Sequence, residues 1–349
     1  MMMQEHTFHY NNEFQLESGE TLPGFSLRYC TFGKINKERS NIIWVCHALT
    51  GNSNVSAWWG GLFGENCLFN PEEHFVICVN VIGSCYGSTG PLSVNPKTGK
   101  PYFHTFPKIT IRDIVATLEI LRVHLNIEKI HTLTGGSLGG QQALEWAVTH
   151  PDLFDNMILM SSNAKHSPWG IAFNETQRMA ISADPTWHND DPNAGYEGMK
   201  AARAIAMLSY RNYETYEKTQ FEETNELQDT YRASSYQRYQ GEKLANRFNA
   251  FSYWVLSDAM DTHNIARGRG SIMNALSQIK AYTQVIGITT DILFPIPEQR
   301  LIVRGIRNVT YEEINSTYGH DGFLVEMNQL DKSIRTFYKQ KEKKQLIHG

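Results

Sequence analysis

A single serine, Ser137, stands between two pairs of glycines in the stretch LTGGSLGGQQALEWA at residues 133–147. Gly135, Ser137 and Gly139 form the pattern G-x-S-x-G, which is typical of a nucleophilic serine on a sharp turn between a strand and a helix. The apolar residues before the motif and the amphipathic run after it provide that context. We predict that Ser137 is a catalytic nucleophile; the alternative is a helix N-cap serine in a packing turn.

A serine hydroxyl becomes an effective nucleophile only when a base takes its proton. In this kind of turn the acidic residue follows the serine along the chain and the histidine comes last. Asp291 follows the apolar stretch QVIGITT, and only His320 and the tail residue His348 come after it among the histidines. We therefore predict a triad of Ser137, His320 and Asp291. The alternatives are a strand-end cap for Asp291 and a turn histidine for His320.

The tetrahedral intermediate of acyl transfer also needs backbone N–H donors for its oxyanion. Leu138, the residue after the nucleophile, is expected to supply one donor. The stretch CHALTGNSN at 46–54 follows an early apolar run and is expected to supply the other from Leu49, with Ala48 or Thr50 as alternatives. The H-E-x-x-H and phosphate-loop motifs are absent, so neither a metal site nor a nucleotide phosphate loop is expected.

Alternating strands and helices must position these groups. Residues 110–127 have the spacing of an amphipathic helix, with Thr110 as its N-cap. Apolar or alternating runs predict strands of a mostly parallel sheet at 24–33, 41–49, 74–83, 129–136, 156–162, 281–295 and 309–324. The chain between the predicted strands at 156–162 and 281–295 has helical patterns. We predict an α/β core at 1–165 and 280–349, with helices on both faces of the sheet, and a helical cap inserted at 166–279.

The composition narrows the class of protein. Of the 349 residues, 41% are hydrophobic and 19% are charged, and the net charge is −4, so a nucleic-acid partner is not expected. No apolar run approaches the roughly 20 residues of a membrane helix. The chain begins without a signal-peptide pattern. Its five cysteines lack C-x-x-C spacing, so we expect them to be reduced and buried in a cytoplasmic protein.

Several stretches have a more specific likeness. They include HALTGNSN, CVNVIGSCYGSTGP, FPKITIRDIV, GGSLGGQQALEWAVTHPD, IAFNETQRMAI, SYQRYQGEKLANRF, TTDILFP and YGHDGFL. Together they resemble the homoserine O-acetyltransferase family of the α/β-hydrolase fold over roughly residues 10–335.

The resemblance implies transfer of an acetyl group from acetyl-CoA to the hydroxyl of L-homoserine, in methionine biosynthesis, by a cytoplasmic homodimer. Acetyl-CoA would be a substrate, and no permanently bound cofactor is expected. The resemblance also implies that Asp321 holds the substrate ammonium and that an arginine, Arg203 or else Arg211, contacts the substrate. The alternatives are a succinyl donor, a serine acceptor, a serine esterase, and a noncatalytic binding protein of the same fold.

Overall fold

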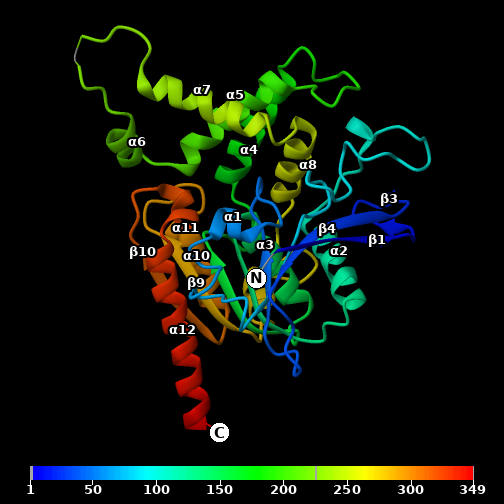
Figure 1. Cartoon of the computed structure of the whole chain (residues 1–349), viewed down its shortest axis with the longest axis vertical. Coiled ribbons are helices and arrows are strands. Elements are labelled where there is room, and N and C mark those ends of the chain that lie inside the picture. The colour runs from blue at the N-terminus through cyan, green and yellow to red at the C-terminus, as the bar shows by residue number, and fades with distance from the viewer. Residues whose placement is uncertain (1–2, 225, 349) are drawn as a thin grey trace.

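The computed structural model describes residues 3–224 and 226–348. Within them, the main feature is an eight-stranded sheet in the order β1-β4-β6-β5-β7-β8-β9-β10 (Figure 1). Its strands are β1 Gln4–Tyr10, β4 Phe25–Phe32, β5 Ile42–Cys46, β6 Phe75–Val79, β7 Ile130–Gly136, β8 Phe154–Met160, β9 Tyr282–Ile288 and β10 Val309–Ile314. A separate pair consists of β2 Phe14–Gln15 and β3 Thr21–Leu22.

The sheet is parallel from β6 to β10, and β4 and β1 extend it antiparallel at one edge. Every residue of β5 and of β9 is buried, as expected for parallel strands covered on both faces. The sequence did not predict β1, because of its seven residues only Phe8 is buried. A polar edge strand has no continuous apolar run to reveal it.

Helices cover both faces of the sheet. One face packs against α2 (Ile111–His124), α3 (Leu138–Thr149), α9 (Ile272–Leu276) and α10 (Ile296–Gly305), which contribute to one hydrophobic cluster. The other face packs against α1 (Val55–Trp59), α11 (Gly322–Val325) and α12 (Met327–His348), which contribute to a second cluster. Consecutive residues of β5 alternate between the clusters, since Ile43 and Val45 belong to the second and Trp44 to the first.

The N-terminus of α2 confirms the predicted cap. The Thr110 hydroxyl accepts from the backbone N–H of Asp113, and the Asp113 carboxylate accepts from the backbone N–H of Thr110. This reciprocal arrangement is a capping box, which satisfies two donors that have no partner inside the helix.

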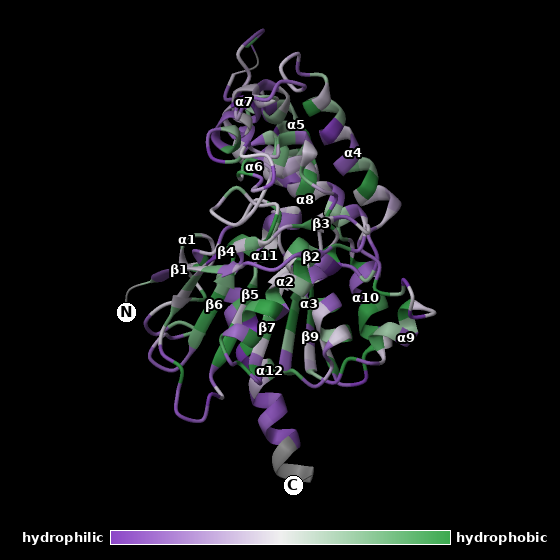
Figure 2. Ribbon diagram, turned by 90° about the vertical axis from the view of Figure 1, so that its right-hand side faces the viewer, coloured by the Kyte–Doolittle hydropathy of each residue, from purple (hydrophilic) through white to green (hydrophobic). Residues whose placement is uncertain are grey.

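Between β8 and α9, the described residues form five further helices. They are α4 (Pro168–Ser182), α5 (Tyr196–Tyr210), α6 (Tyr213–Gln220), α7 (Arg232–Ala245) and α8 (Ala250–Asp261). Figures 1 and 2 show these five, hereafter the cap helices, gathered at one end of the molecule, with the sheet and its covering helices below. The division of the chain at residues 165 and 280 stays a prediction.

The cysteine prediction is only partly right. All five thiols are free, and Cys30, Cys46 and Cys78 are buried, but Cys67 and Cys85 are partly exposed because they lie in loops outside the sheet. No described helix is both long and apolar enough to cross a membrane.

Candidate active site

Ser137 lies at the turn from β7 into α3, where the chain reverses sharply. Its backbone has φ 56° and ψ −126°, a conformation that is rare for a residue with a side chain. A Cβ on Gly135 would lie 2.5 Å from the Gly139 carbonyl carbon, and one on Gly139 would collide with the Cys46 carbonyl oxygen. Only glycine fits at these two positions, so the motif forces the chain to present Ser137 at the tip of the turn.

Asp291 and His320 meet although 29 residues separate them. The Asp291 Oδ2 atom lies 2.7 Å from His320 Nδ1, and the two side chains are 0% and 4% exposed. Asp291 follows β9, and its Oδ1 atom accepts from the backbone N–H groups of Leu293 and Phe294. Each oxygen of the carboxylate thus has its own hydrogen-bond partners. The fixed carboxylate orients the imidazole so that Nε2 is free to exchange a proton.

Two phenylalanines fix the imidazole ring. Phe294 stacks on His320 with ring centroids 5.0 Å apart, and Phe323 meets it edge-on at 5.3 Å. Phe323 also reaches the nucleophile turn, because a Cβ on Gly136 would lie only 2.6 Å from its ring. Gly136, the residue before Ser137, and His320 are therefore both close to the same side chain. In the described part of the chain no hydrogen bond joins Ser137 and His320; such contacts are often long without substrate and shorten when it binds.

The loop after β5 lies against the first turn of α3, as the oxyanion prediction requires. Gln142 Nε2 lies 3.1 Å from the carbonyl oxygen of His47 and 3.2 Å from that of Leu138. Leu49 is buried in this loop. Among the described residues, neither the Leu49 nor the Leu138 backbone N–H donates a hydrogen bond. Both amides are thus available to an oxyanion, although their role stays a prediction.

His47 braces the same loop from within. Its Nδ1 atom lies 2.8 Å from the Ala48 carbonyl oxygen, and its Nε2 atom accepts from the backbone N–H of Val81 at 3.2 Å. A nitrogen that accepts cannot carry a proton, so this imidazole is neutral with its proton on Nδ1. Burial lowers its pKa to about 4, which agrees with that assignment.

The two arginine candidates occupy different positions beside His320. Arg211, at the end of α5, places Nε 3.2 Å from Asp321 Oδ2. Arg203, two turns earlier on α5, lies with Cζ 5.2 Å from the centroid of the Tyr210 ring. Tyr210 in turn lies 5.7 Å from the His320 ring. The Nε atom of Arg203 is buried and has no hydrogen-bond partner among the described residues.

Four aromatic residues between β8 and β9, Trp169, Phe173, Trp187 and Tyr210, do not act as one group. Tyr210 faces His320, but Trp169 is 54% exposed and donates to the Ile292 carbonyl oxygen. Phe173 packs edge-on against Trp169, and Trp187 lines a different cavity. A cavity of about 610 Å³ lies between α5, α6 and the loop residues Thr290 and Ile292, but the buried Asp291 between them does not line it.

Sequence reasoning missed His47, Gln142, Phe294 and Phe323. Gln142 carried a usable signal, because it follows Leu138 by four residues and therefore lies on the same helix face one turn later. The contact of His47 with Val81 spans 34 residues and has no local signature. Among the described residues, no group of three or more histidines, cysteines or carboxylates could hold a metal ion.

Comparison with known proteins gives the family. Residues 41–326 match the model of the alpha/beta hydrolase fold. A homoserine O-acetyltransferase from Cyclobacterium marinum is 53% identical over 96% of this chain and 95% of that protein. One from Chloroherpeton thalassium is 42% identical over 95% and 88%.

Solved structures agree. Homoserine O-acetyltransferase from Bacillus anthracis has a TM-score of 0.90 at 25% identity, covering 97% of this chain and 98% of that one. Esterase E22, at 24% identity and a TM-score of 0.87 over 96% of this chain and 100% of that one, shares the fold. The chain belongs to the homoserine O-acetyltransferase family within the alpha/beta hydrolase fold.

Proposed function

We propose that the protein transfers an acetyl group from acetyl-CoA to the hydroxyl of L-homoserine through an acetyl–Ser137 intermediate. The observation that carries this proposal is the buried Asp291–His320 hydrogen bond beside the strained Ser137 turn. Full-length identity of 53% to a homoserine O-acetyltransferase supports the choice of substrates.

In the first half-reaction, His320 Nε2 takes the Ser137 proton while Oγ attacks the thioester carbonyl carbon. The Leu49 and Leu138 amides stabilise the oxyanion. The C–S bond then breaks, and His320 returns the proton to the departing thiolate. Asp291 stabilises the imidazolium while it carries the proton.

In the second half-reaction, the homoserine hydroxyl replaces the thiol. His320 takes its proton, the hydroxyl oxygen attacks the acetyl carbon, and Ser137 Oγ leaves with the proton from His320. Asp321, held by Arg211, faces the acceptor ammonium, and the unpaired Nε side of Arg203 faces its carboxylate. Because the acceptor is fixed by both charges, its hydroxyl competes with water at high effective concentration.

A thiol-release assay tests the proposal. Purified protein is incubated with acetyl-CoA or succinyl-CoA, together with L-homoserine or L-serine. Release that requires acetyl-CoA and homoserine together supports it. If the protein prefers succinyl-CoA or serine, the proposed donor or acceptor is wrong. If thiol is released equally fast without an amino acid, the protein is a hydrolase. A homodimer, a cytoplasmic location, the methionine pathway and the lack of a resident cofactor stay predictions from the family resemblance.

A further inference from the structure

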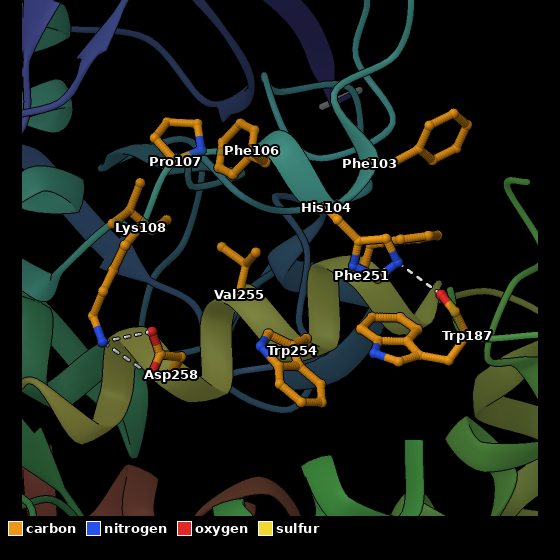
Figure 3. A pocket seen from close by; sticks show the side chains of 11 residues that line it. Phe103, His104, Phe106, Pro107, Lys108, Trp187, Phe251, Trp254, Val255 and Asp258 are labelled. Atoms are coloured by element: carbon orange, nitrogen blue, oxygen red, sulfur yellow. Dashed lines mark hydrogen bonds and ion pairs between the residues drawn. The ribbon is translucent and has the colours of Figure 1, made fainter. Parts of the chain in front are cut away.

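A second cavity, of about 220 Å³, lies between α8 and residues 103–109 (Figure 3). None of the residues assigned above to catalysis or to the homoserine site lines it. Its walls combine aromatic rings at one end with an ion pair at the other, as Figure 3 shows. Its volume is below the roughly 300–1,000 Å³ of sites for drug-sized ligands, so only a small molecule fits.

The aromatic end consists of rings that pack against one another. Trp187 lies 5.2 Å from Trp254 and 4.9 Å from Phe251, measured between ring centroids. The His104 ring nitrogen Nε2 is 2.7 Å from the Trp187 carbonyl oxygen and is therefore already engaged. With Val255 between the two ends, this part of the cavity presents apolar surface to a ligand.

The polar end carries one positive and one negative charge. Lys108 Nζ lies 3.0 Å from Asp258 Oδ2, with the two side chains 53% and 30% exposed. An ion pair this exposed stabilises a protein by only about 0–1 kcal/mol, so a ligand can separate the two groups at little expense. A free α-amino acid carries a matching carboxylate and ammonium, both bonded to the same α-carbon.

We propose that this cavity binds a free α-amino acid with an apolar side chain. The ammonium group meets Asp258, the carboxylate meets Lys108, and the side chain extends along Val255 and Trp254 toward the aromatic end. A ligand with only one of the charges leaves either Lys108 or Asp258 without a partner. A ligand without a side chain leaves the aromatic end of the cavity unfilled. The three parts of the ligand are thus each required.

Two packed helices connect the cavity with the catalytic site. Trp254 lines the cavity, and α8, which carries it, packs against α5, the helix that ends at Tyr210. Tyr210 lies beside His320. A ligand in the cavity therefore contacts a helix that packs against the helix carrying Tyr210, the neighbour of the proposed catalytic base.

Isothermal titration of the full chain tests the proposal, with L-leucine, L-methionine and L-phenylalanine as probes. At least one should bind with a dissociation constant of about 1 mM or tighter. Glycine, isopentylamine and 4-methylpentanoate lack the side chain, the carboxylate and the ammonium, respectively. Each should bind roughly 10-fold more weakly than leucine. Absence of binding by all three amino acids would overturn the proposal.

Two variants locate the site. Asp258→Asn and Lys108→Met should each weaken amino-acid binding roughly 10-fold, because each removes one charge-assisted contact. Asp152→Asn is the control, since Asp152 forms a more exposed ion pair with Lys280 at 2.8 Å and does not line the cavity; it should leave binding unchanged. If Asp321→Asn weakens binding and Asp258→Asn does not, the ligand occupies the homoserine site and the proposal is wrong.

Discussion

Gln142 Nε2 lies 3.1 Å from the carbonyl oxygen of His47, and this contact ties the loop after β5 to the first turn of α3. Each of these segments carries one predicted oxyanion donor. Gln142→Leu should lower kcat roughly 10- to 100-fold with little change in KM, because the donors lose their alignment without losing substrate contacts. Steady-state kinetics with acetyl-CoA and homoserine measure this effect.

Gln284→Leu provides a matched control for that substitution. Gln284 is also buried, and its side chain donates to Ser333 Oγ at 2.7 Å on the far side of the core. Both variants should lower the free energy of unfolding by about 1–3 kcal/mol, since each leaves a buried acceptor without its donor. Equal loss of kcat in the two variants would show that Gln142 acts only through stability.

Asp291→Asn should lower kcat about 1,000- to 10,000-fold. The asparagine carbonyl can still accept from the Leu293 and Phe294 N–H groups, so the fold should survive. Its amide, however, donates toward His320 Nδ1 and favours the tautomer in which Nε2 carries the proton. Circular dichroism checks the fold, and activity near that of the wild type would exclude Asp291 as the triad acid.

Asp321→Asn should raise the KM for homoserine roughly 10-fold, because a charge-assisted contact to the acceptor ammonium is lost. Formation of the acetyl-enzyme from acetyl-CoA should keep its rate, which a burst of free thiol in single-turnover experiments measures. Asp331→Asn, which removes a carboxylate paired with Arg335 on α12, is the control. A slower burst in Asp321→Asn would place this residue in the first half-reaction instead.

His47 makes stability depend on pH. Its pKa is lowered by burial from 6.5 to about 4, so between these pH values the unfolded chain binds one more proton at this residue than the folded chain. Above pH 6.5, His47 therefore does not lower the free energy of unfolding. As the pH decreases from 6.5 toward 4, the free energy of unfolding falls. From pH 6.5 to 5 the decrease from His47 alone should be about 2 kcal/mol.

Urea unfolding at pH 7 and pH 5 tests this pH dependence. His47→Gln should reduce the difference between the two free energies of unfolding. His9→Gln, at an exposed histidine that contacts Ser26, should leave it unchanged. An unaltered difference in His47→Gln would mean that His47 is not neutral in the folded protein.

Much of the fold could be predicted from the sequence, because the patterns that indicate it lie within short segments. The fully buried strands β5 and β9 appear as apolar runs, and Thr110 with Asp113 marks the start of α2 by spacing alone. The turn at Ser137 was equally readable, since its glycines are required by collisions with the adjacent backbone. Local sterics and burial periodicity operate within about ten residues, which is the range that a sequence pattern covers.

The arrangement of side chains around the site could not be predicted from the sequence in the same way. Arg211 meets Asp321, and Tyr210 meets His320, only because α5 packs beside the loop that carries His320. Where the two arginines lie relative to His320 depends on how α5 docks on the core. Such docking is decided by many weak contacts between distant segments, and none of them leaves a pattern of its own.

Intact-mass measurement after rapid mixing of the protein with acetyl-CoA, in the absence of homoserine, tests the central claim most directly. We expect a mass increase of one acetyl group, mapped by peptide fragmentation to Ser137, and its disappearance when homoserine is added. Ser137→Ala should show no increase. Turnover of acetyl-CoA and homoserine by the Ser137→Ala variant at the wild-type rate, or an acetyl group on a different residue, would contradict the account.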